Sequence, residues 1–420
     1  MPLGFYIIMA AQFFSALADN ALLIVAIAAL RAMDTPPAYE PLLKTFFSLS
    51  YVLLAVFVGA FADSMPKGRV MFISNAIKIA GCVMMFFGAH PLAAYAVVGL
   101  GAAAYSPAKY GILTEYLPHR MLVVANGWIE GLTVVAIILG VVVGSCLIQP
   151  LIVERFLDFT DLDDITTDID ISLGATTVAL VCFFYILAAF FNIFIPKTGA
   201  PNKPLHSKIF SEFSQCFALL WRDRLGQISL AVTTLFWGAG ATLQFIVIQW
   251  SETMLNLDLS QSGMLQGVVA IGVAVGAAGA AKTISMRKSI SVIPLGIAMG
   301  IVVLIMNFVT TRALAVPLLI VIGALSGYFV VPMNALLQHR GHSLMGAGNS
   351  IAIQNFNENL SILVMTGMYY MMVNANLSTY AVITTFGLFV SISMLLVKFR
   401  HEANQRIHDD VSLLDDSHLH

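Results

Sequence analysis

The 420-residue chain carries few charges for its length, because hydrophobic residues make up 59% of it and charged residues only 10%. Soluble domains usually carry about 25% charged residues, so most of this surface must face lipid rather than water. The formal net charge of -2 comes without a basic domain, and we expect no nucleic-acid partner. The four cysteines form neither a metal-binding spacing nor a disulfide framework, so we expect no cofactor and no metal.

Long apolar runs recur along the whole chain. A helix needs about 20 apolar residues to cross the roughly 30 Å hydrocarbon core of a membrane. The first run, Phe5 to Leu30, is too long for the core of a signal peptide, so we predict an uncleaved first span. The pattern predicts an all-α integral membrane protein with twelve transmembrane helices. Their predicted positions are 5–30, 46–62, 69–88, 92–112, 123–149, 172–195, 227–250, 263–284, 290–309, 314–336, 346–373 and 377–398.

The basic residues are distributed unequally between the two sides of these helices. With both termini in the cytoplasm, sixteen of the 21 lysines and arginines fall in cytoplasmic segments and four in outside segments, while Lys78 lies inside the third span. Lysine and arginine concentrate in the cytoplasmic loops of membrane proteins. We therefore predict a multi-pass protein of the bacterial inner membrane with both termini in the cytoplasm.

The loops divide the chain into two halves. Residues 196–226 join the sixth and seventh spans through a basic, proline-bearing segment, which is where a two-bundle transporter places its linker. We predict one six-helix bundle at residues 1–195, a cytoplasmic linker at 196–226, a second bundle at 227–400 and a cytoplasmic tail at 401–420.

An acidic loop is predicted outside the membrane at residues 150–171, where the chain carries seven Asp and Glu residues. Strings such as D-L-D-D are compatible with calcium. The loop lacks the glycine and the terminal glutamate of an EF-hand. A solvated acidic loop is the simpler interpretation, and calcium binding is the alternative.

The two halves share a pattern of polar residues. Pro107 and Pro332 lie in similar strings, 225 positions apart. Each is followed by a basic loop, an asparagine and an acid, which is Glu130 in the first half and Glu358 in the second. Transporters of the major facilitator type are built from two such halves, with the site between them near the midplane. Chance similarity between apolar helices is the alternative.

Several ionisable residues lie inside predicted spans. A charge at that depth is costly, and it marks either a partner or a cavity. For each of them, a packed ion pair or amide network between helices is the alternative to a substrate contact. These residues are Asp19, which is followed by Asn20, in the first span, Lys78 in the third, Lys109 in the fourth, Glu130 in the fifth and Glu358, within Q-N-F-N-E-N, in the eleventh.

A loop after the second span has the pattern G-x-x-x-D-x-x-x-[KR]-x-[KR] that is typical of major facilitator proteins. Its members here are Gly59, Asp63, Lys67 and Arg69. Glycine permits close approach between helices, and the aspartate can pair with a cation or accept hydrogen bonds from a helix N-terminus. We predict that these four residues form a latch that holds one conformation of the two halves.

Motifs of enzymes and of ATP-driven pumps do not occur in the chain. It contains no Walker lysine loop, no G-x-S-x-G, no H-E-x-x-H and no cluster of histidine and cysteine. We therefore expect a secondary transporter that is not an enzyme.

Five strings, spread from the first span to the eleventh, carry a resemblance to one family. They are A-Q-F-x-S-A-x-x-D-N-A-L-L, A-D-S-x-x-K-G-R-V, G-A-A-A-Y-S-P-A-K-Y-G-I-L, F-W-G-A-G-x-T-L and F-V-V-P-x-N-A-L-L-Q. In these strings the chain resembles the bacterial lysophospholipid transporter family, LplT-like, of the major facilitator superfamily.

The resemblance implies a function. Members of that family move lysophospholipids, such as lysophosphatidylethanolamine, from the outer to the inner leaflet of the inner membrane, where an acyltransferase/acyl-carrier-protein synthetase re-acylates them. In this chain that enzyme is expected to be a separate protein, and the transporter itself a monomer. By family pattern, Asp19 would meet a headgroup amine and Lys109 a headgroup phosphate. The predicted substrate-binding residues are Asp19, Asn20, Tyr105, Lys109, Glu130, Gln244 and Glu358.

One position departs from the family. Relatives commonly carry an arginine after F-W-G-A-G-x-T-L, where this chain has Gln244. Glutamine can hydrogen-bond a phosphate but offers no fixed positive fork. Either the headgroup preference differs, or Lys109 contributes more of the phosphate binding. The alternative to lipid transport is a proton-coupled exporter of drugs or metabolites, for which Asp63 and the buried carboxylates are the motivation.

Overall fold

A computed structural model describes the chain except for residues 118, 150–172, 199–208, 285, 346 and 408–420. Within the described part, all regular structure is helical. The acidic loop at 150–171 lies outside the described residues, so calcium binding there stays a prediction.

The described chain forms two compact units. The first contains Met1–His206 with Leu257–Gly267, and the second contains Ser207–Asn256 with Val268–His420. The helices of the first unit are α1 (Leu3–Ala32), η1 (Pro37–Tyr39), α2 (Glu40–Asp63), α3 (Lys67–Phe86), α4 (Pro91–Tyr116), α5 (His119–Leu147) and α8 (Leu173–Ile193). The first residues of α11 (Leu259–Thr283) also belong to this unit.

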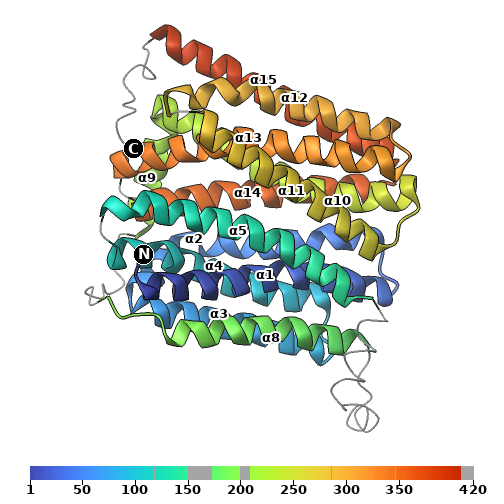
Figure 1. Cartoon of the computed structure of the whole chain (residues 1–420), viewed down its shortest axis with the longest axis horizontal. Helices are drawn as coiled ribbons and strands as arrows, with labels where there is room; N and C mark the ends of the chain where they lie inside the picture. Colours follow the sequence, from blue (N-terminus) through green and yellow to red (C-terminus); the bar gives the residue numbers. More distant parts are fainter. Residues whose placement is uncertain (118, 150–172, 199–208, 285, 346, 408–420) are drawn as a thin grey trace. The chain divides into compact units, whose positions relative to one another are not determined.

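The second unit contains the rest of α11 and the remaining helices (Figure 1). They are α9 (Ile209–Arg222), α10 (Arg224–Leu255), η2 (Met286–Val292), α12 (Ile293–Leu304), η3 (Ile305–Phe308), α13 (Arg312–Met345), α14 (Ala347–Asn374) and α15 (Thr379–Ile407). The helix α15 extends seven residues into the predicted tail, and the predicted linker contains the helix α9.

Most helices run beyond the apolar stretches that predicted them. α2, for example, begins at Glu40 rather than at residue 46, and α10 ends at Leu255 rather than at residue 250. Hydropathy marks only the part of a helix that lies in hydrocarbon, whereas the backbone hydrogen bonds continue into the headgroup region. Among the described residues, nine helices are long and apolar enough to cross a membrane. For α4, α5 and α14 the spanning role stays a prediction, and with it the count of twelve.

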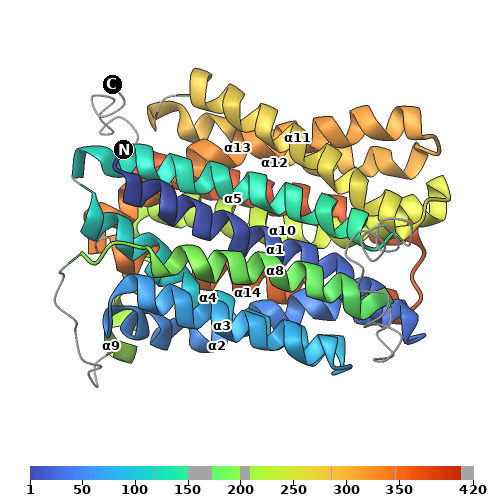
Figure 2. The same ribbon diagram turned by 60° about the horizontal axis from the view of Figure 1, so that its bottom comes forward.

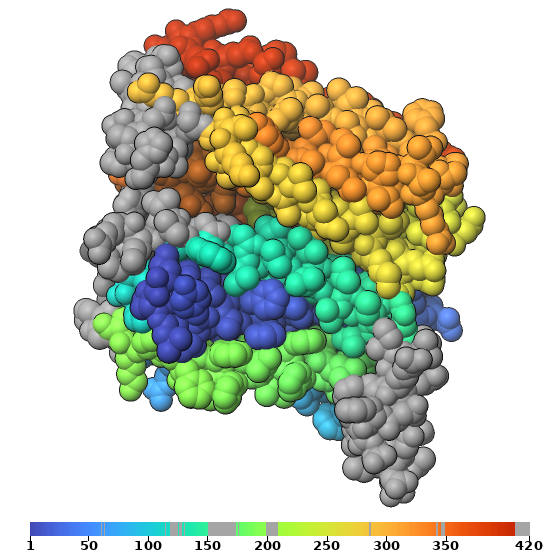
Figure 3. Space-filling model, viewed as in Figure 1, coloured from blue at the N-terminus to red at the C-terminus, as the bar shows by residue number. Residues whose placement is uncertain are grey.

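The first unit is built around α1, which packs against α4, α5 and α8. Figure 2 shows α1 and α8 running alongside each other, and in Figure 3 α1 is bordered by α5 and α8. Ala18, Ala21 and Leu22 are fully buried, as are most of their neighbours along the helix. A helix that is buried on most sides belongs in the centre of a bundle, and α1 takes this place in the first unit.

The second unit repeats the packing of the first. The contacts of α1 with α5 and α8 correspond to those of α10 with α14 and α15. The contacts of α3 with α4 and α8 correspond to those of α12 with α13 and α15. This correspondence supports the internal repeat that Pro107 and Pro332 indicate in the sequence.

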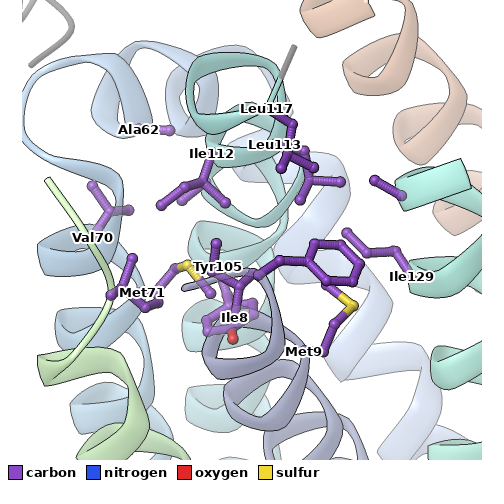
Figure 4. Packing of buried hydrophobic residues seen from close by; sticks show 14 residues of the cluster. Ile8, Met9, Ala62, Val70, Met71, Tyr105, Ile112, Leu113, Leu117 and Ile129 are labelled. Carbon is purple, nitrogen blue, oxygen red and sulfur yellow. The ribbon is translucent and has the colours of Figure 1, made fainter. Parts of the chain in front are cut away.

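A cluster of buried apolar side chains closes the end of the first unit at which α1 and α3 begin. Ile8 of α1, Met71 of α3 and Ile112 of α4 are buried together (Figure 4). Tyr105 belongs to the same cluster and is 5% exposed. The cluster therefore fixes α1, α3 and α4 directly beside the polar residues described below.

The amphipathic helix α9 packs on α10, α13 and α14 through Phe213, Cys216, Phe217 and Trp221. The indole Nε1 of Trp221 donates to Asn357 Oδ1 at 3.2 Å. Burial raises the pKa of the Cys216 thiol, and the nearby charge of Glu212 raises it further. The predicted linker is thus anchored to the second unit over this helix.

Glycines hold α11 and α13 in close contact within the second unit. A side chain at Gly276 would collide with the carbonyl oxygen of Ala324, and one at Gly327 with the carbonyl oxygen of Val273. Small residues allow membrane helices to approach to backbone contact.

We expect Gly276→Leu to destabilise the protein by about 1–3 kcal/mol, because the obstructing atom is backbone and cannot rotate away. Gly240→Leu is the matched control, since a Cβ there meets no heavy atom within 4 Å. Thermal unfolding of the purified proteins in detergent measures both. Equal melting temperatures for the two variants would contradict the close packing.

Candidate functional site

Three polar side chains share one face of α1. Gln12, Ser15 and Asp19 are spaced i, i+3 and i+7, the spacing that places residues on one side of a helix. Gln12 is 2% exposed and Ser15 is 1% exposed. The face spans about 10 Å along the helix axis. Gln12 bonds to α5, Ser15 to α3, and Asp19 to both α3 and α8.

Asp19 forms an ion pair with Lys78 of α3. The Lys78 Nζ lies 2.8 Å from Asp19 Oδ2 and 2.9 Å from Ser15 Oγ. The side chain of Lys78 is 2% exposed and that of Asp19 is 16% exposed. For Asp19 the structure therefore realises the ion-pair alternative in this conformation.

Two tyrosines complete the environment of Asp19. The hydroxyl of Tyr185 in α8 donates to Asp19 Oδ1 at 2.7 Å, and that of Tyr95 in α4 donates to the Asp19 carbonyl oxygen at 3.1 Å. Both oxygens of the Asp19 carboxylate therefore have a partner, Lys78 on Oδ2 and Tyr185 on Oδ1. The neighbouring Asn20 is buried, and its amide nitrogen donates to the Ala16 carbonyl oxygen at 2.9 Å.

Tyr105 lies next to the lysine of this pair. The Lys78 Nζ is 5.2 Å from the centre of the Tyr105 ring, a cation–π distance. The hydroxyl of Tyr105 is buried and has no hydrogen-bond partner among the described residues. The ring therefore stabilises the buried cation, and the hydroxyl retains hydrogen-bonding capacity.

Lys109 lies one helical turn beyond Tyr105 on α4 and contacts α5. Its Nζ is 3.5 Å from Thr133 Oγ1 and 4.4 Å from the centre of the Tyr110 ring. Gln12 of α1 donates to the same Thr133 hydroxyl at 2.7 Å. Lys109 and Thr133 are half-buried, whereas Gln12 is buried. Together these residues place a cation at one end of the polar face of α1.

The second unit carries the corresponding polar group. Glu358 of α14 is 7% exposed and accepts a hydrogen bond from Gln354 Nε2 at 2.8 Å. The same nitrogen donates to Asn334 Oδ1 of α13 at 2.8 Å. Shifted by 225 positions, Lys109 and Thr133 fall on Asn334 and Glu358, so both halves join these two helices through polar side chains at equivalent positions. Gln244 is half-buried on α10.

The four residues of the predicted latch lie in different environments, and the latch itself stays a prediction. A Cβ at Gly59 would meet no heavy atom within 4 Å among the described residues. Lys67 is 5% exposed, lies 3.4 Å from Glu115 Oε1 and donates to the Ala62 carbonyl oxygen at 2.8 Å. Arg69 is exposed. The side chains of Asp63 and Glu130 lie outside the described part of the structure, so their roles stay predictions.

A second ion pair lies in the other unit, at the residue that corresponds to Glu115. Glu115 shifted by 225 positions falls on Arg340. Arg340 Nε donates to Asp223 Oδ1 at 3.1 Å, and the Arg340 Nη2 also contacts the same carboxylate. Asp223 in turn accepts the Gly226 backbone N–H at 2.7 Å and caps α10. Each half therefore has a cation–carboxylate link at the end of α4 or α13.

We expect Lys67→Glu to lower both stability and uptake, because it places two carboxylates beside each other where an ion pair stood. Breaking a buried pair costs about 3–5 kcal/mol. The exchanged double variant Lys67→Glu/Glu115→Lys restores the pairing and should recover most of the melting temperature. A double variant no more stable than the single one would show that the pair is not formed.

Several residues of this site were not predicted from the sequence. Gln12 and Ser15 could have been predicted from their helical spacing with Asp19 along the first span. Tyr95, Thr133 and Tyr185 have no local signal, because each is an ordinary residue of an apolar helix that meets α1 only after folding.

Comparisons with known proteins agree with this architecture. A family model described as Major Facilitator Superfamily matches residues 8–366. The human organic anion transporter MFSD10 (TETRAN) superposes with a TM-score of 0.66 at 14% identity, over 94% of this chain and 100% of that one. A bacterial homolog of the human lysosomal transporter Spinster, inward-facing and occupied, gives a TM-score of 0.65 at 14% identity over 96% of each chain. These two likenesses show the fold.

Two curated relatives are much more similar in sequence. The lysophospholipid transporter LplT of Yersinia enterocolitica is 40% identical over 384 residues, which cover 90% of this chain and 89% of that protein. LplT of Yersinia pestis strain Pestoides F is 40% identical over 381 residues, or 89% and 88% of the two chains. The chain belongs to the LplT family of lysophospholipid transporters, within the major facilitator superfamily.

Proposed function

We propose that this protein is a secondary transporter that moves lysophospholipids, such as lysophosphatidylethanolamine, from the outer to the inner leaflet of the bacterial inner membrane. The observation that carries the proposal is the 40% identity to LplT proteins over nine tenths of the chain. Both termini are cytoplasmic, the protein acts as a monomer, and a separate acyltransferase/acyl-carrier-protein synthetase re-acylates its product.

The charges of the first unit suit such a cargo. Lys109 offers an ammonium group to a phosphate, and charge-assisted hydrogen bonds of this kind are among the stronger ones. Asp19 offers a carboxylate to a headgroup amine, for which it must exchange its bond to Lys78. The Tyr105 hydroxyl supplies a further polar contact, and the apolar walls of the helices accommodate the acyl chain.

The pairing of Asp19 with Lys78 implies a specific step in transport. A headgroup amine competes with the Lys78 ammonium for one carboxylate, while the headgroup phosphate attracts the lysine. A zwitterionic headgroup satisfies both partners at once, whereas a purely cationic or anionic solute leaves one buried charge uncompensated. This exchange favours zwitterionic lipids over simple ions.

Uptake of labelled lysophosphatidylethanolamine into spheroplasts with and without the gene tests the proposal. We expect uptake only in the cells that carry it. Equal uptake in cells with and without the gene would contradict the proposal. Drug resistance on overexpression together with substrate-driven proton movement would favour an exporter instead.

A further inference from the structure

A cavity of about 350 Å³ lies in the second unit between the start of α12 and the last turns of α15. Figure 1 shows these two helices side by side, and they pack along their length. The residues that line it include Arg287, Ser291, Pro294, Lys398, His401 and Glu402. This volume is in the range of small-molecule sites, and none of these residues belongs to the predicted transport site.

The cavity lies at the level of the lipid headgroups. α15 has 29 residues, a length of about 43 Å, whereas the hydrocarbon core is about 30 Å thick. The helix therefore emerges from the core by about two and a half turns, and the sequence from Lys398 to Ile407 is the polar part that emerges. With the predicted orientation, this end faces the cytoplasm.

The emerging turns of α15 are held in place rather than left free. Asn404 Nδ2 donates to the Arg224 carbonyl oxygen at 3.2 Å, and Arg400 Nε donates to Gln227 Oε1 at 3.1 Å. His401 and Asn404 are each 7% exposed. Both hydrogen bonds attach α15 to the start of α10, so the wall of the cavity is preformed.

The cavity is lined by more positive than negative charge. Arg287 reaches it from η2, and Lys398 from α15. The carboxylate of Glu402 is the one acidic group among the lining residues, and it lies 3.8 Å from Lys398 with 45% of its side chain exposed. An exposed pair at that distance is weak, so Lys398 remains available to a stronger anion. Arg287 is itself exposed.

Apolar side chains continue from the cavity toward the membrane. Leu395, Leu396 and Phe399 are exposed on α15, and Ile301 and Ile305 are exposed farther along α12 and η3. Side chains of this kind on spanning helices face the acyl chains of lipid. The cavity thus combines an anion-binding end with an apolar approach, which is the chemistry of a phospholipid rather than that of a free phosphate ion.

The geometry points to a binding site for an anionic phospholipid of the cytoplasmic leaflet, with its phosphate between Arg287 and Lys398 and its chains along α12 and α15. Basic pockets between helices at this depth are typical headgroup sites. The bound lipid is a resident lipid and not the transported one. The inference is therefore independent of the proposed cargo, although it uses the predicted orientation.

The test is a titration of the purified full-length protein in detergent with phosphatidylglycerol, phosphatidylcholine or inorganic phosphate, followed by the shift in melting temperature. Arg287→Gln/Lys398→Gln removes the two cavity cations. Lys288→Gln/Arg406→Gln is the matched control, because it removes two exposed cations from the same two elements outside the cavity lining.

We expect phosphatidylglycerol to stabilise the wild type and the control variant with similar affinity, and the cavity variant about thirtyfold more weakly, the effect of two cations at a membrane surface. An equal loss of affinity for phosphatidylglycerol in the two variants would show that the effect comes from general surface charge, and would contradict a specific site. An equal response to phosphatidylcholine, or full stabilisation by inorganic phosphate alone, would also overturn it. If the double variant does not fold, Lys398→Gln against Arg406→Gln gives the same comparison.

Discussion

Asp19→Asn is expected to abolish lysophospholipid uptake and to lower the stability of the protein by about 3–5 kcal/mol. The substitution leaves the Lys78 ammonium, 2% exposed, without its carboxylate in a region of low dielectric constant. Removing one partner of a buried ion pair is strongly destabilising for this reason. Thermal unfolding in detergent and uptake of labelled lipid measure the two effects separately.

The double variant Asp19→Asn/Lys78→Met separates structure from function. Replacing a buried pair by neutral side chains of similar volume is often neutral or stabilising, so we expect the melting temperature to recover. Uptake should stay at background, because the headgroup amine then has no carboxylate. Recovery of both stability and uptake would show that Asp19 serves only to neutralise Lys78.

Lys109→Ala is expected to reduce uptake about thirtyfold to a hundredfold while leaving the melting temperature nearly unchanged. Lys109 is half-buried and bonds to Thr133 at the long distance of 3.5 Å, so the fold depends little on it. Its contact with a phosphate is charge-assisted, and such bonds contribute about 2–3 kcal/mol. Concentration-dependent uptake by proteoliposomes measures the loss.

Two comparisons make this prediction specific. Thr133→Val removes the hydroxyl that Lys109 and Gln12 share but keeps the cation, and we expect a much smaller loss. Competition by a monoacylglycerol, which has no phosphate, should be the same for wild type and Lys109→Ala. If Lys109→Ala weakened competition by the monoacylglycerol as strongly as it weakened lysophospholipid uptake, Lys109 would support the site rather than bind the phosphate.

Gln244 bears on how much of the binding Lys109 must provide. The family resemblance implies an arginine at that place, whereas Gln244 has no charge. We propose that Lys109 is accordingly the principal phosphate contact in this protein. Gln244→Arg then offers a second cation. The same uptake assay, run with lysophospholipids of different headgroups, measures its effect on headgroup preference.

The sequence allowed much of the architecture to be predicted, because the solvent imposes it. Every span in lipid must be an apolar helix, so hydropathy located the helices and the repeat followed from their polar residues. The depth of Asp19 in α1 was also predictable. Its partner was not, because Lys78 lies 59 positions away and only the packing of α3 against α1 and α8 brings the two together.

The latch shows a different limit. The motif drew attention to Asp63 as the residue that pairs with a cation, whereas the structure pairs Lys67 with Glu115, which lies on a helix outside the motif. In the second half, Arg340 lies at the position that corresponds to Glu115, but its partner Asp223 lies at the start of α10. A search for the same residue types at the same positions misses this pair, because the shared position carries the opposite charge and a different helix supplies its partner.

The central claim, that this protein moves lysophospholipids across a bilayer, is tested most directly with the purified protein in liposomes. Labelled lysophosphatidylethanolamine is added to one leaflet, and its arrival in the other is followed over time. We predict saturable movement of the lipid that depends on the protein and is lost in Asp19→Asn/Lys78→Met. Movement no faster than in protein-free liposomes, with the protein folded and monodisperse, would contradict it.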